Sequence, residues 1–298
     1  MENNILDNTD ISRHLGKASE YKTQYDASLL VRETRKINRE NIGIYSKLPF
    51  VGSDTWNVYE ASALTDNGLP VTSIIKIIYP ADNNWIVESK SLKLYFNSFN
   101  MTKIGSDAKS VNDKMCELAS KDLSELLETN VSVTGFNPTS INTTTYQQPE
   151  YNVLEDIENV DSIKFDQYAE DDSILQSIES IGEQRFQSSL LRSNCKITKQ
   201  PDNGTIYIHI IPNEKSIQAA SLLKYIVSYR NECHFHESII ESVYYKLWNK
   251  LQPKELLVKG LYVRRGGIDI VPQRASSEFM LDKDLIDPIK PYVKTSRQ

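Results

Sequence analysis

Residues 193–211, SNCKITKQPDNGTIYIHII, give the clearest indication of the fold, since they predict two strands joined by a tight turn. The pieces 193–199 and 205–211 are rich in β-branched side chains, which favour strands. Between them, residues 200–204 combine a proline, which fixes one backbone φ angle, with Asn-Gly, which favours the positive φ angles of hairpin turns. We therefore expect an antiparallel hairpin here.

The residues that follow this hairpin predict two helices and two further strands. Apolar side chains recur at helical spacing in two segments, and Pro253 ends the second of them. Gly266 and Gly267 separate the last two strands. The expected helices are 216–230 and 237–251, and the expected strands are 256–264 and 268–272. The predicted order in this half of the chain is therefore ββααββ.

The N-terminal half approximates the same order. A turn at Asp66-Asn67-Gly68 separates two stretches that are rich in β-branched and aromatic residues. The expected strands are 56–64, 71–79 and 131–136, and the expected helices lie near 91–99 and from about 107 to 128. We infer a twofold duplication of a ββααββ unit, which is an α+β fold with antiparallel sheets and helices on one face.

A polar stretch between the halves, residues 137–180, predicts a long connection with a strand-like piece at 163–168. A structureless link of that length is unusual inside one compact domain, so it favours two modules. We expect an N-terminal unit at 1–150, a connection at 151–180 and a C-terminal unit at 181–298.

Composition and charge exclude several classes of protein. The chain has 298 residues and a formal net charge of -6, which argues against broad binding of nucleic acids. The sequence has no run of about 18 apolar residues, so no membrane span is expected. The polar N-terminus is unlike a signal peptide. Three unevenly spaced cysteines, Cys116, Cys195 and Cys233, then favour reduced thiols in a cytoplasmic protein. The Gly-rich motifs of Rossmann and P-loop sites and the Gly-x-Ser-x-Gly elbow of hydrolases are absent.

Cys195 and Asp202 are the first candidates for chemistry. Arg192, Lys196 and Lys199 surround Cys195 in the sequence, and their charge favours the thiolate form. A thiolate with a nearby carboxylic acid can add to an electrophilic carbon and protonate the atom that receives the charge. The alternative is a cysteine that packs in the core and an aspartate that serves the turn.

The segment from Cys233 to Glu237 is the second candidate. His234 and His236 are spaced as a zinc pair, or one of them is a general acid. The alternative is a loop that enters a helix and carries two surface histidines. No matching second cluster of ligands is visible in the sequence.

Two further segments combine charged groups with small residues. Glu88 to Lys93 either form a capped helix start with a solvated face or bind a purine-like ring and phosphate. Arg264 to Gly267 either form a charged strand end or let a phosphate approach the backbone.

Together these segments resemble the long form of the NADPH-dependent 7-cyano-7-deazaguanine reductases, the nitrile reductases of queuosine biosynthesis, a tRNA modification. The Glu88–Lys93 motif with Tyr95 is specific to that family, and the Cys195 and Asp202 pair accompanies it. The matching segments are LGKASEYKTQYDASLL (15–30), LPFVGSDTWNVYEASAL (48–64), VESKSLKLYFNSFN (87–100), LLRSNCKITKQPD (190–202), FHE (235–237) and RRGGIDI (264–270).

The resemblance implies a tunnelling fold with two ββααββ units, a homodimer and NADPH as co-substrate, with no metal, nucleic acid or membrane partner. It implies reduction of 7-cyano-7-deazaguanine to 7-aminomethyl-7-deazaguanine through a covalent thioimide on Cys195. Asp202 and His236 would be the further catalytic residues. The implied substrate-binding residues are Val87, Glu88, Ser89, His236 and Glu237, and the implied NADPH-binding residues are Ser89, Lys90, Arg265 and Gly266.

Three rival functions stay open at this point. A metal-dependent cyclohydrolase of the same fold, acting on a purine or pterin, would use Cys195, His234 and His236 as zinc ligands. A purine-binding module that has lost turnover would keep the fold without needing the Cys195 and Asp202 pair. An amidine-forming relative would form the same thioimide and then transfer ammonia, so it would not need Lys90 and Arg265.

Overall fold

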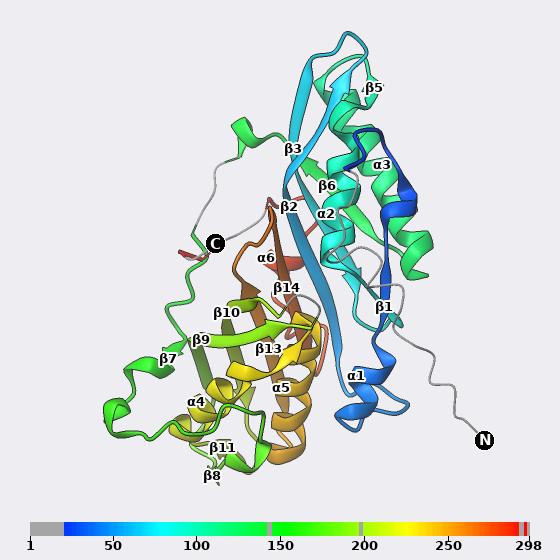
Figure 1. The fold of residues 1–298 in the computed structure, drawn as a ribbon. Helices are drawn as coiled ribbons and strands as arrows, with labels where there is room; N and C mark the ends of the chain where they lie inside the picture. The colour runs from blue at the N-terminus through cyan, green and yellow to red at the C-terminus, as the bar shows by residue number, and fades with distance from the viewer. Residues whose placement is uncertain (1–20, 142–144, 197–198, 292–294, 297–298) are drawn as a thin grey trace, which may run out of the picture.

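A long hairpin starts the central sheet in the computed structural model, which describes residues 21–141, 145–196, 199–291 and 295–296. Strands β2 (Val51–Thr65) and β3 (Pro70–Pro80) pair antiparallel, and the hairpin projects beyond the rest of the sheet (Figure 1). Gly68 has a φ of 89° in the connecting turn, a backbone conformation that glycine adopts without strain. The predicted turn at 66–68 is confirmed.

Helices α2 (Ser89–Ser98) and α3 (Ala108–Leu127) pack on one face of this hairpin. The capping box between Asp107 and Ser110 starts α3, and a buried side chain then recurs at every fourth position. These side chains pack with Trp56 and Ile75 of the sheet. Strand β6 (Ser132–Phe136) then returns to pair with β3.

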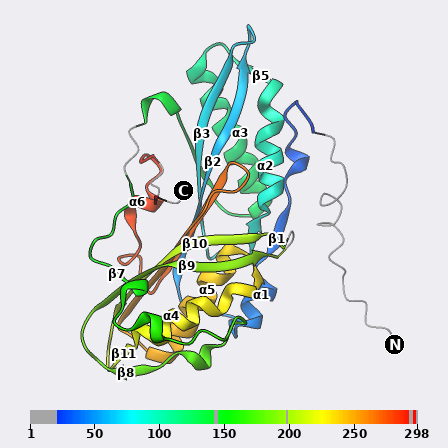
Figure 2. The same ribbon diagram turned by 60° about the vertical axis from the view of Figure 1, so that its left-hand side comes forward.

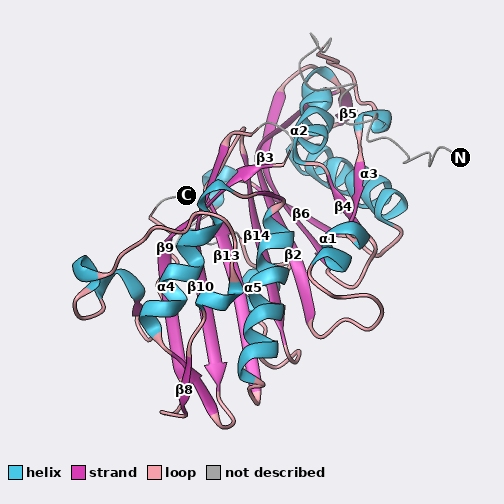
Figure 3. Cartoon of the chain, turned by 60° about the horizontal axis from the view of Figure 1, so that its bottom comes forward, coloured by secondary structure: helices cyan, strands magenta, loops and turns pink. Residues whose placement is uncertain are grey.

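The C-terminal half has the predicted order ββααββ (Figure 3). Its last strand pairs with β2, so both halves form one ten-stranded sheet, whose main path is β12-β9-β10-β13-β14-β2-β3-β6. The long elements are β9 (Gln184–Cys195), β10 (Pro201–Ile211), α4 (Ala219–Ser228), α5 (His236–Leu251), β13 (Glu255–Tyr262) and β14 (Ile268–Ala275). The short ones are β1 (Arg32–Thr34), α1 (Lys36–Asn41), β4 (Trp85–Val87), β5 (Lys103–Gly105), β7 (Asn152–Val153), β8 (Ser177–Glu179), β11 (Lys215–Ile217), β12 (Cys233–His234) and α6 (Lys283–Ile286).

The two halves differ in their last strand. Among the described residues, no strand follows β6 in the N-terminal half as β14 follows β13. The chain instead continues through 137–180, where β7 joins the central sheet and β8 pairs with β11, while the strand predicted at 163–168 is wrong. A strand needs a partner edge, and the outer edge of β9 is already paired with β7 and β12.

The turn predicted at 200–204 is also wrong, since β9 ends at Cys195 and β10 already begins at Pro201. Lys199 has a φ of 59°, while Asp202 pairs with Ser193 inside the ladder. Gly204 is needed for a close approach, because a Cβ there would lie 3.1 Å from the Tyr262 ring. Asp202 is therefore held on a strand.

A C-terminal segment covers the face of the sheet that α2 to α5 leave open (Figure 2). The buried ammonium of Lys259 pairs with Asp282 at 2.6 Å, and Lys76 donates to the carbonyl of Asp287. Thr55 donates to the carbonyl of Leu285 in α6. No helix in the described ranges is long and apolar enough to cross a membrane. Residues 15–20, which contribute to the resemblance, lie outside the described residues.

Candidate active site

A cavity of about 220 Å³ lies where the two halves of the chain meet. Helix α2 supplies one wall, and the loop after β9, the start of β10 and the β13–β14 turn supply the rest. The lining residues are Glu88, Ser89, Lys90, Lys93, Cys195, Gln200, Asp202, His236, Tyr262, Val263, Arg265, Gly266, Ile268 and Ile270. An adjoining recess of about 20 Å³ adds Trp56, Val87, His234, Phe235 and Glu237.

Glu88 is fixed by the helix that it starts. Its carboxylate accepts hydrogen bonds from the backbone N–H of Lys90 at 3.0 Å and of Ser91 at 2.7 Å, which caps α2. Ser89 Oγ also donates to the same carboxylate at 3.5 Å. A carboxylate has about four lone-pair sites, so these three donors do not use all of its acceptor positions. Glu88 can therefore cap α2 and also accept hydrogen bonds from a purine-like ring.

Cys195 and Asp202 project from the same face of the β9–β10 hairpin. The backbone N–H of Cys195 donates to the carbonyl of Gln200 at 2.8 Å, and Ser193, two residues before Cys195 on β9, pairs with Asp202. Side chains two residues apart on a strand share a face. Both residues line the cavity, and Cys195 is half-buried while Asp202 is buried.

The first turn of α5 supplies His236 and Glu237. The His236 ring lies 4.0 Å from the Tyr262 ring, centroid to centroid, and its Nε2 lies 3.5 Å from Oδ2 of Asp202. Glu237 is 3% exposed, and among the described residues its Oε1 has no hydrogen-bond partner. An unpaired buried carboxylate oxygen is costly, so this atom is suited to a ligand that donates to it.

Cationic groups and a glycine turn border the opposite side of the cavity. Gly266 and Gly267 have φ angles of 58° and 79°, as a two-residue hairpin turn requires. A Cβ on Gly266 would lie 3.1 Å from Nζ of Lys93, so this lysine lies directly against the turn. With Lys90 and Arg265 it forms a basic margin of the kind that binds phosphate.

The two acids of the site have opposite electrostatic settings. Burial raises the pKa of Asp202, but His236 and the Arg265 guanidinium, which donates to Oδ1, outweigh it and hold the pKa below its ordinary value. Burial, with the charge of Asp54 added, raises the pKa of Glu237 to about 7, although His236 and Arg35 oppose the rise. Perturbed acids that converge on one cavity are typical of functional sites.

The structure brings together every residue that the sequence singled out for catalysis or for binding of substrate and cofactor. Of the basic residues near Cys195 in the sequence, Arg192 donates to the carbonyl of Arg230. Lys196 lies over the Phe235 ring at 5.2 Å. Lys93, which belongs to the Glu88–Lys93 segment singled out from the sequence, also lines the cavity, whereas Gln200, Trp56 and Tyr262 were not predicted as lining residues.

The zinc ligand set considered from the sequence is not assembled. His234 Nε2 lies 3.3 Å from a carboxylate oxygen of Glu232. Within the ranges that the structure describes, no three His, Cys, Asp or Glu side chains form a group that could hold a metal ion.

A larger cavity, of about 430 Å³, lies on the other side of β9 and β10. Among the described residues that line it there is no Cys, His, Lys, Arg, Asp or Glu side chain. It therefore lacks the nucleophile and the ionisable groups that the smaller cavity combines.

Comparison with known proteins gives consistent matches. A family model described as "Nitrile reductase, 7-cyano-7-deazaguanine-reductase N-term" matches residues 21–134, and one described as "QueF-like protein" matches 201–279. A protein of Hahella chejuensis named NADPH-dependent 7-cyano-7-deazaguanine reductase is 40% identical over 90% of this chain and 95% of its own length. A protein of the same name from Paraburkholderia phymatum is 37% identical over 95% and 97%. The crystal structure of an archaeosine synthase QueF-Like in the apo form covers 35% of this chain and 94% of its own, with 19% identity and a TM-score of 0.28.

Proposed function

The chain belongs to the family of NADPH-dependent 7-cyano-7-deazaguanine reductases, and from this we propose that it reduces the nitrile of 7-cyano-7-deazaguanine to the aminomethyl group. The relatives that bear this name match the chain over both halves and not over one repeat alone. The proposal therefore concerns the whole chain and the cavity between its halves.

The observation that supports this proposal best is the unpaired Oε1 of Glu237 in the recess behind Cys195. A guanine-like ring presents neighbouring N–H donors along one edge, and these suit carboxylate acceptors. Glu88 offers a second acceptor in the same recess, and Trp56 offers an aromatic wall. A ring bound there by its donor edge directs its far side toward the cavity that Cys195 and Asp202 line.

Cys195 is the proposed nucleophile. Its sulfur forms a bond to the nitrile carbon while one π bond of the nitrile breaks and the nitrogen takes a proton, which gives a thioimide. Asp202 is held in its charged form by His236 and Arg265, so it first accepts the thiol proton and then passes it to the nitrogen. Without that proton the addition would leave an anion on nitrogen and would be reversible.

The basic margin is the proposed NADPH site. Lys90 and Arg265 would bind phosphate, Ser89 would donate a hydrogen bond, and Gly266 would let the phosphate approach the backbone. NADPH supplies the hydrides, and two are needed to take a nitrile carbon to the amine level. The protein places the bound carbon between the two sites, so its contribution there is mainly orientation.

His236 is the proposed source of further protons. The imine carbon accepts a second hydride readily only when the imine nitrogen is protonated, and Nε2 of His236 lies 3.5 Å from Oδ2 of Asp202. An imidazole can both donate and accept a proton, which suits repeated proton transfer. Contact with the Tyr262 ring, which is tilted by 49° to the imidazole, holds His236 in place for this role.

Three wider proposals follow from the family. The product would enter queuosine biosynthesis and so serve tRNA modification. The chain would act as a homodimer in the cytoplasm, and units bounded at 1–150 and 181–298, with 151–180 between them, would be its structural modules. Gel filtration with light scattering tests the homodimer, and a monomer would contradict it.

The decisive experiment follows absorbance at 340 nm with the purified protein, the nitrile and NADPH. We expect two NADPH to be oxidised per nitrile consumed and a product with the mass of the aminomethyl compound. NADPH oxidation without that product, or no nitrile-dependent oxidation at all, would contradict the proposed function.

A further inference from the structure

A buried carboxylate one turn beyond Glu237 contacts three arginines. Arg39 donates to both oxygens of Glu241, each at 2.9 Å, and Arg274 donates to its Oε1 at 2.9 and 3.1 Å. Nη1 of Arg35 lies 3.6 Å from the same oxygen. All four side chains are less than 10% exposed, so the cluster is shielded from water.

The cluster joins parts of the chain that are distant in sequence. Arg35 and Arg39 precede β2, Arg274 belongs to β14, and Glu241 belongs to α5. Asp54 of β2 completes it, accepting from Arg35 at 2.5 Å and from Arg274 at 2.8 Å. The cluster therefore links α5 to the N-terminal strand β2 as well as to its own half.

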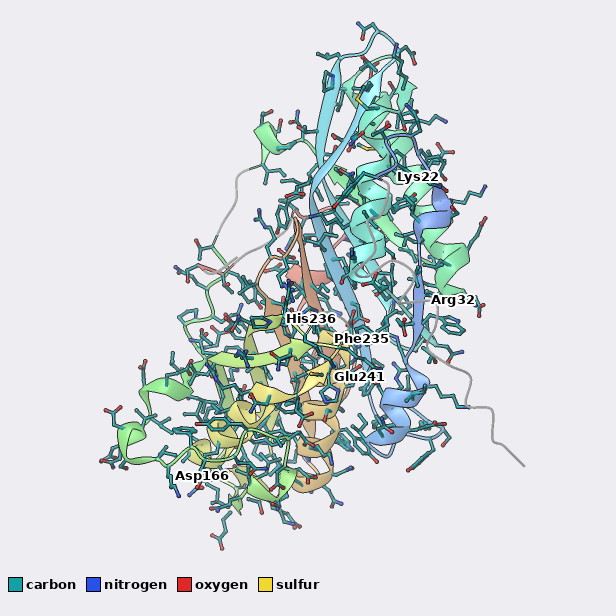
Figure 4. All side chains as sticks on the ribbon, in the orientation of Figure 1. Lys22, Arg32, Asp166, Phe235, His236 and Glu241 are labelled. Atoms are coloured by element: carbon teal, nitrogen blue, oxygen red, sulfur yellow. The ribbon has the colours of Figure 1, made fainter. Side chains whose placement is uncertain are left out.

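The cluster around Glu241 lies one helical turn from the candidate active-site residue Glu237. Glu241 is four residues after Glu237, so the two carboxylates share one face of α5. Figure 4 shows His236 and Glu241 on α5 close to where this helix passes β2. The same cluster supports the wall of the recess, since Arg35 lies over the Tyr79 ring at 5.9 Å and Tyr79 accepts from the indole of Trp56 at 3.0 Å.

We propose that Glu241 and its arginines are positioning groups, which fix the first turn of α5 against β2 so that Glu237 and His236 face the substrate correctly. None of the four touches the cavity, so each acts through the residues that it holds. The inference rests on the proposed function for its kinetic readout, while its structural readout needs no substrate.

Arg39→Gln is the most informative variant. Arg39 reaches Glu241 from α1, and its other hydrogen bonds to described residues go to the backbone carbonyls of Asn83 and Ala81. Arg35 and Arg274 therefore still neutralise the carboxylate after the change. We expect the KM for the nitrile to rise about tenfold while the KM for NADPH stays unchanged. We also expect amide hydrogen exchange at residues 239–245 to become about tenfold faster without any ligand.

Asp282→Asn is the matched control. It breaks another buried ion pair, that of Asp282 with Lys259, on the face of the sheet away from α5. The control should lower the melting temperature comparably but leave both the nitrile KM and the exchange at 239–245 unchanged. If Arg39→Gln does not fold, Arg39→Lys, which retains the charge and loses the fork, should show smaller changes in the same direction.

The outcomes separate this inference from the proposed function. Wild-type protein that reduces the nitrile, with an Arg39→Gln variant that behaves like the control in both readouts, overturns the positioning role alone. Wild-type protein without nitrile reduction contradicts the proposed function, and faster exchange at 239–245 in Arg39→Gln then still supports the positioning role.

Discussion

Arg265 donates a hydrogen bond from its Nη1 to Oδ1 of Asp202, while its Nη2 donates to the side chain of Gln200. The proposed proton-transfer group and the proposed NADPH contact therefore form one ion pair. A phosphate that draws Arg265 away would also remove a counter-charge from Asp202. The two sites are thus electrostatically coupled.

Arg265→Gln should raise the pKa of Asp202, because His236 alone then counteracts the effect of burial. A lowered folded-state pKa stabilises the protein at pH values above the unfolded-state pKa, and this stabilisation is lost as pH falls through the folded-state pKa. The variant should therefore lose about 1 kcal/mol of unfolding free energy at pH 7, since Arg265 is partly exposed, and less at pH 3. Urea unfolding at both pH values measures the difference. An equal loss at both would contradict the ionic pairing.

Cys195→Ala should abolish the covalent adduct with the nitrile and reduce turnover by about 10³-fold or more. Intact mass after incubation with the nitrile, without NADPH, measures the adduct. Cys116→Ser is the control, since burial raises the pKa of the Cys116 thiol to about 12 and keeps it unreactive at neutral pH. An adduct that persists in Cys195→Ala would contradict the proposed nucleophile.

Much of the fold could be predicted from the sequence because local patterns and tertiary contacts agree in it. The four long helices and the β2–β3 turn lie where helical spacing and Asp66-Asn67-Gly68 predicted them. The α+β class with antiparallel strands and helices on one face is likewise confirmed. The turn at 200–204 was wrong because Gly204 is required by the Tyr262 ring and not by a positive φ, and a neighbour that is distant in sequence leaves no local signal.

The candidate site was predictable as a set of residues but not as an electrostatic arrangement. The residues of the motifs meet at the cavity, yet nothing near Asp202 in the sequence indicates Arg265 as its partner, 63 residues away. The buried cluster around Glu241 was missed for the same reason, since its contact with Arg39 spans 202 residues. Trp56 was part of a recognised segment, but only the paired strands show that it lines the recess.

Glu237→Gln should weaken nitrile binding and remove its pH dependence near neutrality. Burial and the charge of Asp54 raise the pKa of Glu237 to about 7, so the fraction that is protonated grows as pH falls below 7. A protonated carboxyl accepts fewer N–H donors, so affinity should fall by up to about tenfold per pH unit below that point. Calorimetry with the Cys195→Ala variant measures binding without reaction. If the affinity of the Cys195→Ala protein, which retains Glu237, did not change between pH 5 and 8, the proposed role of Glu237 in nitrile binding would be contradicted.

Gly204→Ala should disturb catalysis indirectly, by displacing the Tyr262 ring that contacts His236. The added Cβ would lie 3.1 Å from Cδ1 of Tyr262 and 3.3 Å from the carbonyl of Leu261, so the ring must shift. The Tyr262 ring contacts the His236 ring at a centroid distance of 4.0 Å. A displaced imidazole would transfer protons less efficiently, so we expect kcat to fall about tenfold and stability by about 1–3 kcal/mol. Gly182→Ala is the matched control, because its φ of 94° makes alanine strained while no atom lies within 4 Å of the new Cβ. It should lower stability without changing kcat, and an equal loss of kcat in both variants would show that general destabilisation, and not the His236 ring, limits the reaction.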